Sequence, residues 1–168
     1  MAARCISSRE CSRVSTASTE AKASLRDGGV GAGAAAISRP TRKQQRRGDR
    51  VVIVDDSAAC REVFRELLER RGYDVAGEAA SAASATDLID RLRPAAVLLD
   101  VHLPDGNGFE LAAYLSRRHP DLAILLTSID FRENFYALAD VSGARGFVPK
   151  TQLAQVQFGL FWSARARA

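Results

Sequence analysis

Two adjacent carboxylates follow a short apolar stretch in the sequence VVIVDDS. The apolar residues Val51–Val54 lead directly into Asp55 and Asp56. Like charges this close repel each other, and each raises the cost of ionising the other. A metal ion, a lysine or solvent could offset that repulsion, so this pair is the first candidate for chemistry in the chain.

Three further apolar stretches also end in polar side chains. Asp100 ends AAVLLD, Thr127 and Ser128 end LAILLTS, and Lys150 ends GFVPK. Three carboxylates in one pocket would suit Mg²⁺, which prefers oxygen ligands in an octahedron and retains several waters. A cation, an ammonium and a hydroxyl around one aspartate suit phosphoryl transfer, which is mostly positioning and charge neutralisation. Because carboxylates can form aspartyl phosphates, we expect Asp100 to be the nucleophile.

These polar residues need a scaffold that brings distant strand ends together. Five apolar stretches alternate with segments in which apolar residues recur at helical spacing. This alternation indicates an α/β fold with a doubly wound, five-stranded parallel sheet and helices on both faces. In the flavodoxin-like strand order 2-1-3-4-5, strands one and three are neighbours, and sites form where the strand order reverses. The three carboxylates then converge on one pocket.

The element boundaries are expected from the apolar runs, the helix caps and the Gly or Pro stops. Strands are expected at 51–56, 73–80, 95–100, 122–128 and 143–150, and helices at 57–70, 84–92, 109–118, 134–141 and 151–164. Cys60 falls on the first helix, where it is most simply a small apolar packing residue.

From about residue 50 to residue 150, the chain resembles the receiver domain of two-component response regulators. The resemblance rests on the acidic pair DD, on LLDVHLPDGNG around Asp100, on LLTS with Thr127, and on GFVPK with Phe147 and Lys150. These motifs occur in the family's order, at spacings of 45, 27 and 23 residues between Asp55, Asp100, Thr127 and Lys150. The sequences of these motifs are similar to those of the receiver branch that often carries a LuxR-type helix-turn-helix output domain.

The resemblance implies a signalling phosphoprotein of a phosphorelay and not an enzyme. Asp100 would accept a phosphoryl group from a histidine kinase or a phosphotransfer protein. The cofactor would be Mg²⁺, held by Asp55, Asp56, Asp100 and the backbone carbonyl of His102.

The resemblance also implies a switch next to the phosphoacceptor. Thr127 and Lys150 would bind phosphoryl oxygens, and Phe147 would change rotamer when Thr127 moves. A downstream protein would read the face built from the fourth expected helix, the fifth strand and the last helix.

Three features depart from the family's pattern. Many receivers carry a proline directly after the lysine, whereas Thr151 follows Lys150 here. Only 18 residues follow Lys150, which is enough for one helix but not for an output domain. The ending QFGLFWSARARA crowds four large apolar side chains together, so some of them must face solvent or a partner.

Residues 1–49 read as a disordered basic tail, ahead of a receiver domain at 50–166 whose last helix, at 151–166, need not be regular. The tail has ten Lys or Arg against four Asp or Glu, and the rest of the chain has fourteen against sixteen. The tail has few large apolar residues, so burial of apolar surface there cannot offset the entropy lost on ordering the chain. The alternatives for this segment are a solvated extension or an upstream segment that is not translated in the cell, a nucleic-acid contact, and an organelle transit peptide.

The three cysteines form no disulfide framework. Cys5 and Cys11 lie in the tail, at a spacing that matches no trusted zinc motif. This cysteine usage fits a reducing cytosol, and no apolar run approaches the roughly 18 residues that would span a bilayer. We therefore expect a cytoplasmic protein with no membrane contact, and no direct nucleic-acid contact unless an output domain is missing.

Two other functions are compatible with the sequence. One is a DNA-binding transcriptional regulator that lacks its output domain here. The other is a Mg²⁺-dependent phosphohydrolase, which is weakened because His102 stands where a second acid–base carboxylate is needed. Structural interpretations also exist: the acidic pair could interact with a helix dipole, Phe147 could simply pack in the core, and Thr127 could be a strand-end hydroxyl.

Overall fold

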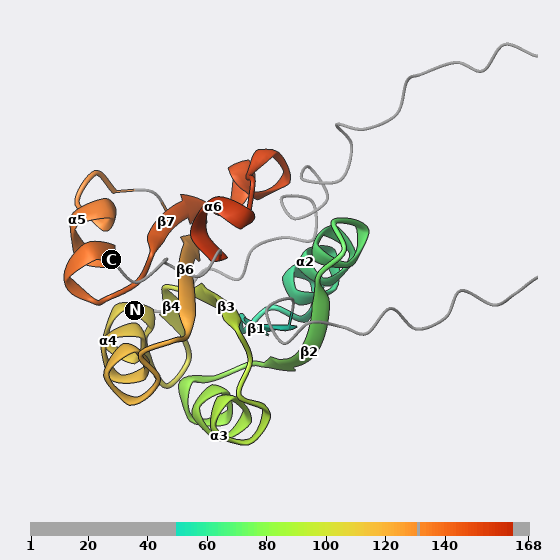
Figure 1. The fold of residues 1–168 in the computed structure, drawn as a ribbon. Helices are drawn as coiled ribbons and strands as arrows, with labels where there is room; N and C mark the ends of the chain where they lie inside the picture. The colour runs from blue at the N-terminus through green and yellow to red at the C-terminus, as the bar shows by residue number, and fades with distance from the viewer. Residues whose placement is uncertain (1–49, 131, 163–168) are drawn as a thin grey trace, which may run out of the picture.

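The computed structural model describes residues 50–130 and 132–162, which fold around a parallel sheet (Figure 1). The sheet strands are β1 (Arg50–Val54), β2 (Asp74–Ala79), β3 (Ala96–Asp100), β6 (Ala123–Ser128) and β7 (Gly146–Pro149). The helices are α2 (Ala58–Arg70), α3 (Ala82–Leu92), α4 (Gly108–Arg118) and α5 (Phe135–Val141), followed by the 3₁₀ helix η2 (Lys150–Gln155) and the short helix α6 (Gly159–Trp162). Two further strands, β4 (His102–Leu103) and β5 (Gly106–Asn107), pair in the loop after β3.

The sheet has the strand order β2-β1-β3-β6-β7, and all neighbouring strands run parallel. Because β4 and β5 form a separate two-stranded ladder, this order is the predicted 2-1-3-4-5. The doubly wound fold expected from the alternation of strands and helices is therefore confirmed. The strand order reverses between β1 and β3, which places the expected site at the C-terminal ends of those two strands.

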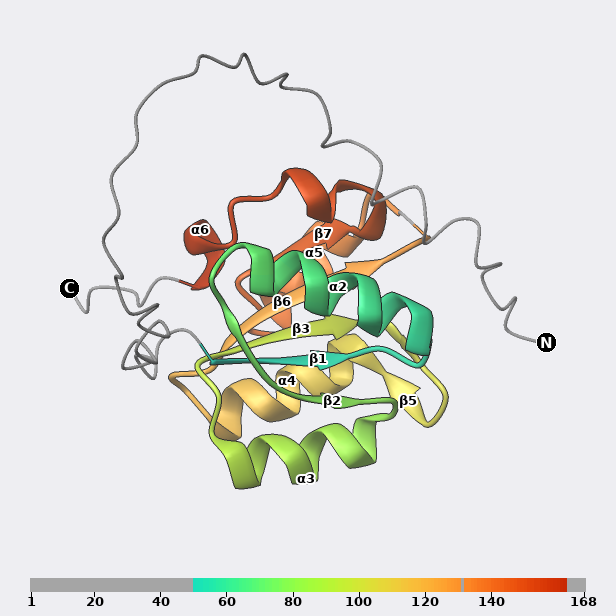
Figure 2. The same ribbon diagram turned by 90° about the vertical axis from the view of Figure 1, so that its right-hand side faces the viewer.

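The sheet buries side chains on both of its faces, which explains why its strands read as continuous apolar runs. On one face, Val52 and Val54 belong to a core shared with α3, α4 and α5. On the other face, Val51 and Ile53 belong to a core shared with α2, η2 and α6. Figure 2 shows this division, with α2 and α3 on opposite sides of the strands. The central strands β3 and β6 therefore carry apolar residues at every position before their polar ends at Asp100, Thr127 and Ser128.

Local capping explains where α2 begins and ends. The side-chain oxygen of Ser57 accepts a hydrogen bond from the backbone N–H of Cys60, as expected for an N-cap serine. Cys60, Phe64 and Leu68 face the core, so Cys60 packs as the sequence predicted. Gly72 follows the helix with φ of +86°, a conformation that glycine adopts without strain.

The segment after β7 differs from the single helix expected at 151–164. Instead, η2 ends at Gln155, Val156 is extended, and α6 covers only Gly159–Trp162. The Arg71 guanidinium donates hydrogen bonds to the carbonyls of Ala154 and Val156. Because these contacts satisfy carbonyls at the end of η2 from outside the segment, the chain can leave the helical path there.

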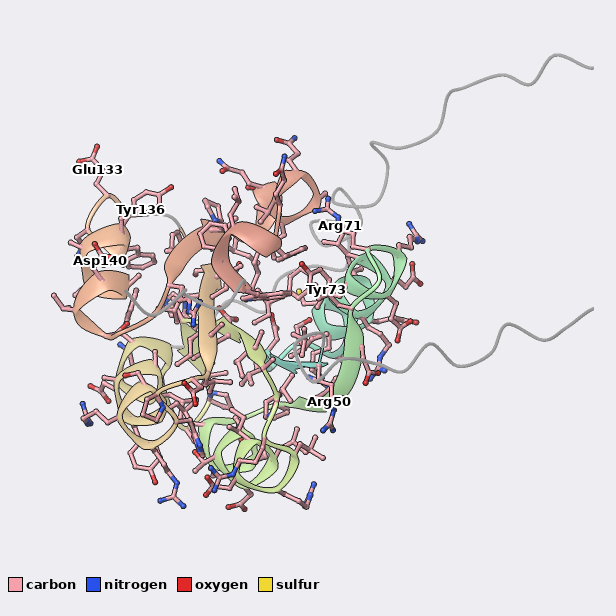
Figure 3. All side chains as sticks on the ribbon, viewed as in Figure 1. Arg50, Arg71, Tyr73, Glu133, Tyr136 and Asp140 are labelled. Atoms are coloured by element: carbon pink, nitrogen blue, oxygen red, sulfur yellow. The ribbon has the colours of Figure 1, made fainter. Side chains whose placement is uncertain are left out.

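Aromatic packing holds the end of this segment against α2. The rings of Phe158 and Trp162 stack with centroids 4.7 Å apart, and Tyr73 meets Trp162 edge-on at 5.0 Å. Figure 3 shows Arg71 and Tyr73 on the side of α2 that faces the C-terminal segment. Leu160 is 79% exposed, which confirms that part of the crowded apolar ending faces outward.

Several predictions from the sequence fall on residues that the structure does not describe. They are the basic tail at 1–49 with Cys5 and Cys11, and the end of the last expected helix at 163–166. Among the helices of the described ranges, none combines the length and apolar character that a membrane span requires.

A tight turn after β3 requires a glycine at the start of α4. The backbone N–H of Gly108 donates to the carbonyl of Val101 at 2.8 Å. A Cβ atom at this position would lie 2.2 Å from the carbonyl oxygen of Asp100. Gly108 thus allows the loop after Asp100 to fold back against the strand that carries it.

Gly108→Ala should lower the free energy of unfolding by about 1–3 kcal/mol, because the added methyl group must displace the Asp100 backbone. Urea denaturation measures this change. Gly106→Ala is the matched control in the same loop, since a Cβ there would meet only the Ala82 side chain at 3.5 Å. Equal stability of the two variants would contradict this explanation of Gly108.

Candidate functional site

The polar residues singled out in the sequence lie at one edge of the sheet. In the strand register, Asp100 pairs with Thr127, and Thr127 pairs with Val148. Asp55 directly follows β1, the other neighbour of β3, and Lys150 directly follows β7. The predicted convergence of these strand ends is therefore present in the structure.

Lys150 joins the two buried carboxylates of the site. Its Nζ lies 2.7 Å from Oδ2 of Asp55 and 2.7 Å from Oδ2 of Asp100. None of the three side chains is more than 5% exposed. Because a buried charge is costly unless it is paired, the lysine is what allows both aspartates to be ionised here. For the adjacent pair Asp55 and Asp56, the lysine binds the Asp55 carboxylate, and the Asp56 side chain is exposed to solvent.

Burial shifts the protonation of the site. It raises the pKa of Asp55 from 3.8 to about 6, although the Lys150 charge opposes this change and the Asp100 charge adds to it. Burial also raises the pKa of Asp100, again against the effect of Lys150. Burial would lower the pKa of Lys150, but the two carboxylates outweigh it and hold that pKa above its usual range. When both carboxylates are ionised, they exceed the lysine by one negative charge, which a further cation could neutralise.

The donor set at this edge fits a divalent cation. One carboxylate oxygen from each of Asp55, Asp56 and Asp100 lies within 4.8 Å of the other two. Asp56 is exposed whereas its two partners are buried, so the cluster is open to water on one side. Oxygen ligands with room for several waters are the environment that Mg²⁺ prefers. The His102 carbonyl, in the loop directly after Asp100, stays a predicted fourth ligand.

Thr127 is buried on β6 beside Asp100, and Phe147 is buried on the next strand, β7. The Thr127 hydroxyl donates to the carbonyl of Val148 on the adjacent strand at 2.8 Å. The Phe147 ring is 3% exposed and packs edge-on against Phe135 at 5.3 Å and Tyr136 at 5.7 Å. In this conformation Thr127 is a strand-end hydroxyl and Phe147 a core residue, and their switch roles stay predictions.

The sequence interpretation missed a side-chain contact across the mouth of the site. His102 Nδ1 lies 3.1 Å from the Oγ of Ser128, and the His102 backbone N–H donates to Asp100 Oδ1 at 3.3 Å. The sequence could have indicated this contact, because His102 and Ser128 come shortly after Asp100 and Thr127, which pair across β3 and β6. The contact connects the loop after β3 to the end of β6.

Comparison with known proteins matches most of the described chain to one family. The response regulator receiver domain model matches residues 51–156. The chemotaxis protein CheY of Thermotoga maritima is 31% identical over 103 residues, which cover 61% of this chain and 86% of CheY. The DNA-binding transcriptional activator DevR/DosR of Mycobacterium tuberculosis is 39% identical over 102 residues, which cover 60% of this chain but only 47% of that activator. The solved signal receiver domain of NarL from Mycobacterium tuberculosis is 32% identical with a TM-score of 0.58, covering 63% of this chain and 90% of that domain.

Lys150→Met should destabilise the folded chain, by about 3 kcal/mol at pH 8, and the loss should shrink at pH 5. The reason is that without the ammonium the pKa values of both buried carboxyl groups rise further in the folded state. When the pKa of a group is higher in the folded state than in the unfolded state, stability falls as the pH rises between the two values. For Asp55 in the parent protein, this pH range runs from 3.8 to about 6. Urea denaturation at both pH values measures the difference.

Asp56→Asn is the control for this prediction, because it removes the exposed carboxylate of the same cluster. Its free energy of unfolding should stay within about 0.5 kcal/mol of the parent. A Lys150→Met variant that is as stable as the parent at pH 8 would show that the lysine does not compensate the buried charges.

Proposed function

Because this chain belongs to the response regulator receiver domain family, we propose that it is a phosphorylation-driven switch of a two-component pathway in which Asp100 accepts the phosphoryl group. The observation that supports Asp100 is its position 2.7 Å from the Lys150 ammonium and within the cluster formed with Asp55 and Asp56. The donor would be a histidine kinase or a phosphotransfer protein in the cytoplasm.

The proposed reaction moves one phosphoryl group between two side chains. A carboxylate oxygen of Asp100 forms a bond to phosphorus while the bond from phosphorus to the donor histidine breaks, and that electron pair returns to the imidazole nitrogen. Lys150, now bound to Asp100 Oδ2, would instead neutralise a phosphoryl oxygen. Asp55, Asp56, Asp100 and the His102 carbonyl would hold Mg²⁺, which when bound supplies positive charge for the phosphoryl oxygens.

The proposed switch begins at Thr127. Its hydroxyl donates to the Val148 carbonyl, so donation to a phosphoryl oxygen would require breaking that contact with β7. Phe147 is the preceding residue of β7 and packs against Phe135 and Tyr136 of α5. Movement at the end of β6 would thereby reach α5.

A downstream protein would read the face that includes α5, β7 and the segment after β7. Tyr136 of α5 is 50% exposed on this face. Glu133, just before α5, and Asp140, within it, are also exposed, and Figure 3 labels these side chains with Tyr136 around α5. A change in the packing of Phe147 against Tyr136 would alter this surface, which is how phosphorylation would change partner binding.

A second candidate is the receiver part of a DNA-binding transcriptional regulator. The 39% identity to DevR/DosR favours it, because that relative is a DNA-binding activator of which the match covers 47%. The comparisons support it no better than a stand-alone switch, since CheY is matched over 86% of its length. Coding DNA beyond residue 168 that encodes a helix-turn-helix unit would decide for the DNA-binding regulator.

Incubation with acetyl phosphate and Mg²⁺ should add the mass of one phosphoryl group to the chain, as measured by intact-protein mass spectrometry. Asp100→Asn should acquire no adduct, because it lacks the carboxylate nucleophile, and chelation of Mg²⁺ should suppress the adduct on the parent.

Asp105→Asn is the matched control from the same loop. The Asp105 carboxylate accepts hydrogen bonds from the backbone N–H groups of Ala82 and Ala83, so this variant should still acquire the adduct. An unmodified parent, or an Asp100→Asn variant that still gains the mass, would show that Asp100 is not the phosphoacceptor.

A further inference from the structure

An arginine from the start of α2 reaches the backbone of the acidic pair. Arg61 Nη1 donates to the carbonyl oxygen of Asp55 at 2.7 Å and to the carbonyl oxygen of Asp56 at 3.2 Å. One guanidinium nitrogen therefore holds two consecutive peptide groups. These are the peptide groups next to the side chains that belong to the acidic cluster.

A glutamate on β2 fixes this guanidinium from the other side. Arg61 Nε lies 3.2 Å from Oε2 of Glu78, and the Arg61 and Glu78 side chains are 17% and 23% exposed. The other oxygen of Glu78 is bound by Arg65, whose Nη2 lies 2.7 Å away. Arg61 thus lies between an oriented carboxylate and the two carbonyls, which limits the positions that it can take.

The acidic loop has few other constraints at Asp56. The Asp55 backbone N–H donates to the carbonyl of Ala79 at 3.1 Å, and Asp55 Oδ1 accepts from the backbone N–H of Ser57 at 3.0 Å. These contacts hold Asp55 and its side chain. Asp56 has an exposed side chain, and its carbonyl shares a peptide group with the Ser57 N–H that binds Asp55 Oδ1. Arg61 therefore fixes the carbonyl side of a peptide group whose N–H side already binds the cluster.

We propose that Arg61 is a positioning residue for the divalent cation site. By holding both carbonyls, it keeps the Asp55 and Asp56 carboxylates within reach of Asp100 before a cation arrives. This inference rests on the proposed function, because the cation site is the one that phosphorylation of Asp100 would use. Residues that orient metal ligands typically change metal affinity by 10–100-fold when they are removed.

The charge of Arg61 acts in the opposite direction to its positioning role. A positive side chain near a cation site repels the cation, so removal of charge alone would strengthen Mg²⁺ binding. Removal of a positioning contact weakens it. The sign of the change in Mg²⁺ affinity therefore separates the two roles.

The test is calorimetric titration of MgCl₂ into the parent protein and three variants. Arg61→Ala should weaken Mg²⁺ binding by about tenfold, and Arg61→Lys, which keeps the charge and one donor group, should show a smaller loss. Arg65→Ala is the matched control, because it removes the same charge and the other contact to Glu78 but reaches neither carbonyl. It should bind Mg²⁺ as tightly as the parent or slightly more tightly.

A second readout separates positioning from loss of the fold. At saturating Mg²⁺, the Arg61 variants should form the acetyl phosphate adduct at the parent rate, because excess cation compensates for weaker binding. Thermal unfolding without Mg²⁺ identifies a variant that does not fold. If Arg61→Ala does not fold, the Mg²⁺ affinity of Arg61→Lys is the test.

Equal or tighter Mg²⁺ binding by Arg61→Ala, an equal loss in Arg65→Ala, or a slow adduct at saturating Mg²⁺ would each overturn the role of Arg61. A parent protein that binds no Mg²⁺ would instead overturn the cation site of the proposed function, and the role of Arg61 with it.

Discussion

The Lys150 ammonium, 2.7 Å from a carboxylate oxygen of Asp55 and 2.7 Å from one of Asp100, holds together two buried negative charges that would otherwise repel each other. The three residues follow or end β1, β3 and β7, so the contact depends on the order in which the strands assemble. In turn, it permits carboxylates to be buried at the sheet edge. When both carboxylates are ionised, the three side chains keep one net negative charge. The contact that allows the carboxylates to be buried therefore also leaves a charge that attracts a cation.

Most of the fold could be predicted because the sheet is buried on both faces, and runs such as Val51–Val54 mark its strands directly. Predicted and observed boundaries of these strands differ by one to three residues: Tyr73 and Leu122 lie just before their strands, and the last strand begins at Gly146 instead of Gly143. The end of the chain could not be predicted from local pattern. There, hydrogen bonds from Arg71 and the stacking of Phe158 on Trp162 decide the path, and these contacts join residues far apart in the sequence.

The acidic cluster and the lysine could be predicted because strand ends meet wherever parallel strands pair, whatever the loops do. Contacts made by the other long side chains could not be predicted, because the atoms that such a side chain contacts depend on loop geometry. Arg61 lies on a helix that the sequence did predict, yet nothing in the spacing indicated that it would bind the carbonyls of Asp55 and Asp56. The orientation of the Thr127 hydroxyl toward Val148 is likewise a rotamer choice that residue type does not determine.

The aromatic stack after η2 gives this protein an internal optical probe. Trp162 is the one tryptophan in the sequence, and it is 6% exposed between Phe158 and Tyr73. Its fluorescence therefore reports on a single place, the seam between the C-terminal segment and the residues that follow α2. Emission from this indole will shift when that seam opens to water, whereas rearrangements confined to Tyr136 and α5 leave its surroundings unchanged, since α5 covers the opposite face of the sheet.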